Sequence, residues 1–151
     1  LIRDPHREVR IRVAMRIDAA ALAALCDDED YYVRMLAARR LPQALLPRLI
    51  DDPDREVRME VVARLEPAQL MRMADDPEVS VRRAVAGRAP PALLARMAAD
   101  PAWEVRWEVA QRAPAELAAT LLGDAEAEVR AAAAERLQAL RAPGQQEQSH
   151  G

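Results

Sequence analysis

A 24-residue unit repeats along almost the whole chain and constrains the fold more than any other feature. Its clearest copy begins at Asp52 and reads DPDREVRMEVVARLEPAQLMRMAD. Successive copies begin, without a change of register, at Asp4, Asp28, Asp52, Asp76, Asp100 and Asp124. So short a unit cannot bury an apolar face alone, and neighbouring copies must stack on one another. The repeat therefore predicts an array of small units rather than a globule with one central core.

Each copy contains the pattern of one amphipathic α-helix. Counting the leading Asp as position 1, position 2 is Pro in four copies. Asp followed by Pro is typical of a helix start, with Asp as the N-cap. Position 6 is Val in every copy, and positions 10 and 14 are Val, Ile, Leu or Ala. This i, i+4, i+8 spacing predicts one buried helical face, and a Pro at position 15 or 16 in four copies predicts the helix end.

A second, shorter apolar pattern follows in each copy. Positions 19 and 22 are Leu, Met or Ala, as in Leu46 and Leu49, and few residues remain before the next Asp. The i, i+3 spacing favours a 3₁₀ helix, although a single α turn also satisfies it. No copy shows the alternating strand pattern of an ordinary leucine-rich repeat. The predicted fold class is an all-α solenoid of 24-residue repeats, each with one α-helix and one short 3₁₀-like helix, without a β-sheet.

The motif D-P-x-x-x-V-R-x-x-(V/A)-(A/V)-x-R, which stands at Asp52 to Arg64, resembles that of the leucine-rich repeat variant family. The resemblance covers Asp4 to about Leu137 and implies a right-handed superhelix of alternating α and 3₁₀ helices. It also implies, for some members, a cysteine-rich segment with a [4Fe-4S] cluster before the repeats. Cys26 is the only cysteine here and lies inside a repeat without further ligands, so we predict no metal ligand or cofactor within this chain. By resemblance, a cluster would belong to a segment upstream of residue 1.

The repeat also predicts how the chain is divided. Leu1, Ile2 and Arg3 match the end of a unit, so we expect residues 1–3 to belong to a truncated preceding repeat. Residues 4–137 form the array, and residues 138–151 are expected to be a polar, disordered tail. Half of the chain is apolar, but Phe is absent, which predicts an aliphatic core.

Arginine occupies two positions in every copy. Position 13 holds Arg16, Arg40, Arg64, Arg88, Arg112 and Arg136, and position 7 holds Arg10, Arg34, Arg58, Arg82, Arg106 and Arg130. On a helical wheel position 13 lies about 20° from the Val column, inside the buried arc, and position 7 lies at its margin. A guanidinium there can pair with the recurring Asp residues or with free carbonyls of the next repeat. We interpret the arginines at position 13 as a structural ladder; a basic surface for phosphates is the alternative.

Positions 4 and 8 point away from the predicted core, at about 160° and 200° from the Val column. Large apolar side chains mixed with arginine on such a face are typical of protein interfaces. We predict a partner-binding surface made of Trp103, Trp107, Tyr31, Met35, Arg55, Met59 and Arg83. Lateral packing of these side chains onto neighbouring repeats is the alternative.

The leading functional hypothesis is a non-enzymatic scaffold that binds another protein. The first alternative is the repeat domain of an iron–sulfur redox or regulatory protein, with its cluster upstream. The second is nucleic-acid binding, which the abundance of arginine favours and the net charge of −3 disfavours. No catalytic motif and no membrane-spanning apolar run is present in the sequence, and a cytoplasmic location is expected by default. The oligomeric state is left open.

Overall fold

A computed structural model describes residues 1–142 of the chain. These residues form helices and connecting turns, and none of them lies in a β-strand. They divide into two compact units, Leu1–Met73 and the part that begins at Ala74. The predicted all-α fold, built from alternating longer and shorter helices, is confirmed.

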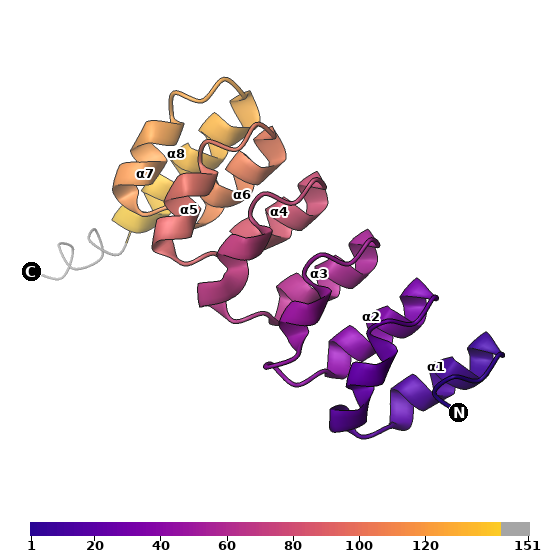
Figure 1. The fold of residues 1–151 in the computed structure, drawn as a ribbon. Coiled ribbons are helices and arrows are strands. Elements are labelled where there is room, and N and C mark those ends of the chain that lie inside the picture. Colours follow the sequence, from indigo (N-terminus) through magenta and orange to yellow (C-terminus); the bar gives the residue numbers. More distant parts are fainter. Residues whose placement is uncertain (143–151) are drawn as a thin grey trace, which may run out of the picture. The chain divides into compact units, whose positions relative to one another are not determined.

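The first unit contains three repeats, each an α-helix followed by a 3₁₀ helix. In chain order these are α1 (Arg7–Arg16), η1 (Ala19–Leu25), α2 (Tyr31–Arg40), η2 (Leu46–Leu49), α3 (Arg55–Arg64) and η3 (Pro67–Met73). Helix α2 packs against α1 on one side and α3 on the other, and the three lie side by side (Figure 1). This arrangement matches the stacking that the repeat predicts.

The second unit contains five α-helices: α4 (Val79–Ala86), α5 (Pro91–Met97), α6 (Trp103–Arg112), α7 (Ala115–Leu121) and α8 (Ala127–Arg141). Its short helices α5 and α7 are therefore α, unlike the 3₁₀ helices of the first unit. The difference begins in the first turn. The Leu94 N–H donates to the Pro90 carbonyl four residues back, whereas the Gln69 N–H in η3 donates to Glu66 three residues back. The i, i+3 apolar spacing suits both geometries.

The leading Asp of each repeat is not the N-cap, so the predicted helix starts are wrong by a few residues. The first helix of each repeat begins at position 4, and in α2 the N-cap is Asp30, which accepts a hydrogen bond from the Tyr32 N–H. The Asp at position 1 instead accepts, at 2.9 Å, the N–H of position 3, in His6, Asp30, Asp54, Glu78, Ala102 and Glu126. A short carboxylate that bonds the backbone two residues ahead makes an Asx turn. This turn directs the chain into the helix.

The apolar columns at positions 6, 10 and 14 face the interior, as predicted. From the second copy onward they are buried at Val33, Ala37, Leu41, Val57, Val61, Leu65, Val81, Val85, Ala89, Val105, Val109, Ala113, Val129 and Ala133. The short helices complete the core with positions 19 and 22, for example Leu22 and Leu25 in η1. Burying each Val or Leu side chain stabilises the fold by about 1.5–3 kcal/mol. The core is aliphatic.

Helix α8 is longer than the repeat predicts. It continues past Leu137 to Arg141, so the predicted array end is too early. Gln138, Ala139 and Leu140 favour helix formation, and no Pro interrupts the chain before Pro143. The rest of the predicted tail, residues 143–151, lies outside the described residues.

Candidate functional site

The arginine at position 7 links one repeat to the next through a bidentate ion pair. In the first unit, Arg34 donates from Nε to Asp52 Oδ2 at 2.9 Å and from Nη2 to Oδ1 at 3.1 Å. Its Nη1 donates to the main-chain carbonyl of Asp28 at 2.8 Å. Equivalent ion pairs, with Nε–Oδ2 distances of 2.8–2.9 Å, are Arg10–Asp28, Arg82–Asp100 and Arg106–Asp124. One guanidinium thus binds the leading Asp of its own repeat and that of the following repeat.

These ion pairs are largely removed from solvent. The side chains of Arg34 and Asp52 are 11% and 3% exposed. The hydrogen bond that Arg34 donates to Asp52 raises the pKa of Arg34, although burial opposes the shift. In the second unit, the hydrogen bond from Arg106 holds the pKa of Asp124 below its ordinary value. Each shift favours the charged form of the group concerned, Arg34 or Asp124.

The arginine at position 13 binds the end of the preceding helix. Arg64 donates from Nη1 to the Ala38 carbonyl at 2.6 Å and from Nη2 to the Leu41 carbonyl at 2.7 Å. These carbonyls belong to the last turn and C-cap of α2, where no further N–H follows to bind them. Bonds of the same kind join Arg40 to Ala14 and Ile17, Arg112 to Ala86 and Ala89, and Arg136 to Ala113. Arg16 is exposed and Arg88 is half-buried.

The predicted depth of the two arginine positions is reversed in most repeats, but not in the last, where Arg130 is exposed and Arg136 is half-buried. Arg10, Arg34 and Arg58 at position 7 are buried, whereas Arg40 and Arg112 at position 13 are exposed. A helical wheel considers one helix alone, but the turn that begins each repeat lies against position 7. Position 13 lies at the helix end and extends across the neighbouring repeat to reach its carbonyls.

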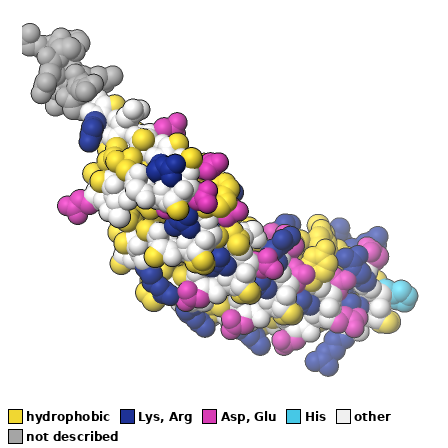
Figure 2. Space-filling model, turned by 90° about the horizontal axis from the view of Figure 1, so that it is seen from above, with side chains coloured by type: hydrophobic (Ala, Val, Ile, Leu, Met, Phe, Trp, Pro, Cys, Tyr) yellow, Lys and Arg dark blue, Asp and Glu magenta, His cyan; other side chains and the backbone are white. Residues whose placement is uncertain are grey.

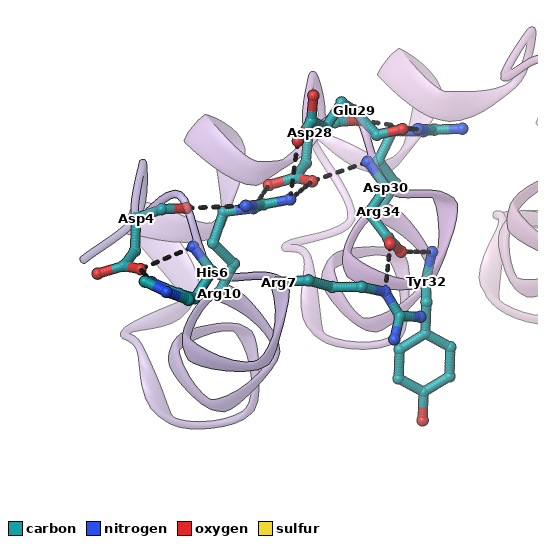
Figure 3. Close-up of polar contacts among 9 residues, drawn as sticks. All are labelled: Asp4, His6, Arg7, Arg10, Asp28, Glu29, Asp30, Tyr32 and Arg34. Atoms are coloured by element: carbon teal, nitrogen blue, oxygen red, sulfur yellow. Dashed lines mark hydrogen bonds and ion pairs between the residues drawn. The ribbon is translucent and has the colours of Figure 1, made fainter.

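The first turns of α1 and α2 carry a further polar cluster, drawn in Figure 3. Arg7 forms an ion pair with Asp30, the N-cap of α2, and its guanidinium carbon lies 5.7 Å from the centre of the Tyr32 ring. Asp4 accepts hydrogen bonds from the main chain and the ring of His6, which lower its pKa. This cluster joins the outer side of the first repeat to that of the second.

The predicted partner surface is only partly exposed in the first unit. Tyr31 is 44% exposed and packs edge-on against Tyr32, with ring centres 6.4 Å apart. Arg55 is exposed and paired with Glu56 at 2.9 Å. Met59 is half-buried, and Met35 is buried at 9% exposure. The predicted exposure of Met35 is therefore wrong, because α2 has a neighbouring helix on each side and position 8 is covered laterally.

In the second unit the structure brings three of the predicted residues together. Trp103 is 38% exposed, Trp107 is half-buried, and both lie on one side of α6. The guanidinium carbon of Arg83, from α4, lies 5.0 Å from the centre of the Trp107 ring. Its Nε also lies 3.4 Å from Glu108 Oε2.

These side chains border a shallow groove of about 200 Å³. The groove is lined by Arg83, Trp103, Glu104, Trp107 and Glu128, and we call it the tryptophan groove. Glu104 and Glu128, which stand at position 5 of successive repeats, are not among the residues predicted from the sequence. Their recurrence beside the outward position 4 is a signal that could have identified them.

Other reactive side chains are not grouped into a site within residues 1–142. Cys26 is buried, and burial raises the pKa of its thiol. No three His, Cys, Asp or Glu side chains in this part of the chain are arranged so that they could hold a metal ion. None of its helices combines the length and the apolar character required to span a membrane.

Comparison with known proteins identifies the repeat. No protein-family model and no curated protein matches the chain. A solved structure described as a leucine-rich repeat variant with a novel repetitive structural motif is 42% identical to it, with a TM-score of 0.85. The match covers 89% of this chain and 57% of that protein, so the chain spans little more than half of its relative's length.

A second solved structure, of an engineered protein, is 15% identical with a TM-score of 0.47, and the match covers 94% of each chain. That likeness is too weak to carry an argument. The first comparison agrees with the repeat signature and with the alternating α and 3₁₀ helices of the structure. The chain belongs to the leucine-rich repeat variant family.

Proposed function

We propose that this repeat array is a non-enzymatic scaffold that binds a partner protein through the tryptophan groove. The exposed indole of Trp103, beside Trp107 and Arg83, is the observation that supports the proposal. Tryptophan and arginine are the side chains most enriched among residues that dominate binding energy at protein interfaces. Here Trp103 and Trp107 lie on the outer side of α6, beside Arg83 of α4, rather than in the core.

A protein partner explains the surface better than a nucleic acid does. The arginines at positions 7 and 13 donate to carboxylates and carbonyls of their own array, for example Arg106 to Asp124 and Arg112 to Ala86. On the face that Figure 2 shows, arginine side chains are interspersed with Asp and Glu rather than gathered into one basic area. A polyanion would meet alternating charges there.

The proposal is tested by comparing proteins captured from a lysate by the wild-type chain and by Trp103→Ala/Trp107→Ala. Loss of two central aromatic side chains should lower recovery of a specific partner about tenfold or more. The control is Met71→Ala/Leu122→Ala, which removes two other exposed apolar side chains and should leave recovery unchanged. Equal recovery by all three proteins would refute the groove as the binding site.

A further inference from the structure

We propose that the tryptophan groove binds an arginine side chain presented by a basic segment of the partner. The inference rests on the proposed function and specifies the chemistry of the partner. It follows from the charge, the aromatic surface and the size of the groove.

The charge of the groove is negative. Glu104 is half-buried and Glu128 is exposed, and neither carboxylate has a hydrogen bond or an ion pair with any residue in the described part of the chain. The one cation of the lining, Arg83, already lies beside the Glu108 carboxylate at 3.4 Å. The two glutamates are therefore uncompensated, and a cation of the partner would complete the site.

The aromatic part of the groove suits a guanidinium. The electron-rich face of tryptophan attracts cations more strongly than the faces of tyrosine and phenylalanine do. Arg83 already places a guanidinium over Trp107, which shows that the geometry is accessible here. A second guanidinium could stack on the exposed Trp103 and donate to the carboxylates through its planar fork. Lysine, as a compact and strongly hydrated ammonium, fits this combination less well.

The size of the groove favours a single side chain. Its volume of about 200 Å³ is below the roughly 300–1,000 Å³ of typical small-molecule sites. Glu104 and Trp107 come from α6, and Glu128 comes from the neighbouring α8, which packs against it. A side chain lying between the two helices could therefore reach both carboxylates at once.

The test is a titration followed by nuclear magnetic resonance. The chain has only two tryptophans, so its two indole N–H signals report directly on the groove. The probe is the peptide acetyl-Gly-Arg-Gly-Arg-Gly-amide, and the matched probe replaces each Arg by citrulline, its neutral analogue. We expect the arginine peptide to shift both indole signals at low salt, and the shift to weaken as salt is added. The citrulline peptide should bind at least about tenfold more weakly, because the ion pairs and the cation–π contact are lost together.

A pair of variants tests the carboxylates. Glu104→Gln/Glu128→Gln should weaken binding of the arginine peptide about tenfold. Glu116→Gln/Glu135→Gln makes the same change in net charge at two exposed sites outside the groove, and should weaken binding less than twofold. Equal binding of both peptides, or equal losses in both variants, would overturn the inference. If these outcomes occur while Trp103→Ala/Trp107→Ala still loses the captured partner, the proposed function survives and only the arginine chemistry is refuted.

Discussion

Replacing Asp52 with alanine tests whether the arginine–aspartate pairs hold the repeats together. Asp52 accepts two hydrogen bonds from Arg34, at 2.9 and 3.1 Å, and one from the Asp54 N–H at 2.9 Å. The substitution leaves the largely buried Arg34 guanidinium without its carboxylate. Removing one partner of a buried ion pair costs about 3–5 kcal/mol. We expect the lower end, about 3 kcal/mol, because Arg34 keeps its bonds to the carbonyls of Asp28 and Glu29.

The measurement is urea unfolding followed by circular dichroism. With a slope of about 2 kcal/mol per molar urea, the midpoint should fall by about 1.5 M. The control is Glu56→Gln, which breaks the Arg55–Glu56 pair in the same repeat, where the side chains are 52% and 50% exposed. It should cost about 0.5 kcal/mol or less, since exposed ion pairs contribute little.

A double variant distinguishes the effect of losing the Arg34–Asp52 hydrogen bonds from the cost of leaving the Arg34 charge buried without a partner. Arg34→Met/Asp52→Ala should be more stable than Asp52→Ala alone, because no buried guanidinium remains unpaired. If Asp52→Ala instead costs no more than Glu56→Gln, the pair does not join the repeats and the reasoning is refuted.

Two further predictions concern the other bonds between repeats. Arg64→Lys should lower the free energy of unfolding by about 1–1.5 kcal/mol, because one ammonium cannot replace both guanidinium bonds to the Ala38 and Leu41 carbonyls. Urea unfolding measures this change, and a variant as stable as wild type would contradict the prediction. The lowered pKa of Asp124 means that its ion pair stabilises the fold above the unfolded Asp pKa of about 3.9, and that this stability is lost as pH falls through the lower folded pKa. Asp124→Asn should therefore be less stable than wild type at pH 7, with the gap in urea midpoint closing below about pH 4; a gap that does not change with pH would refute the assignment.

The helices and the core could be predicted from sequence because the same spacing of apolar residues within each repeat determines both. Val at position 6 with apolar residues at positions 10 and 14 leaves a helix with a single apolar face, and only stacking can bury it. The helix starts could not be predicted as well. An Asp before a Pro serves equally as an N-cap or as the acceptor of an Asx turn, and the choice at Asp52 depends on where the following backbone leads.

The candidate site was predicted in part for a similar reason. Trp103 and Trp107 follow from their outward positions, because a helical wheel describes one helix correctly. It contains no information about the distance between neighbouring helices, and so it missed Glu128, which reaches the groove from another repeat. The same omission explains Met35, which points outward on its own helix but is covered by the helices beside it.

Different positions of a repeat form the bonds between repeats and the outer surface, and this separation explains how such an array can acquire a binding function. The recurring bonds between repeats use Asp at position 1 and Arg at positions 7 and 13, and the position 13 arginines donate to main-chain carbonyls, as Arg64 does. Main-chain acceptors are present whatever the side chain, so these recurring bonds do not use positions 4 and 5, although in the first repeat Arg7 at position 4 adds an ion pair to Asp30. Those positions hold Tyr31 and Tyr32 in one copy and Trp103 and Glu104 in another, with the same helix beneath them. A partner surface can therefore change residue by residue without altering the bonds that hold the repeats together.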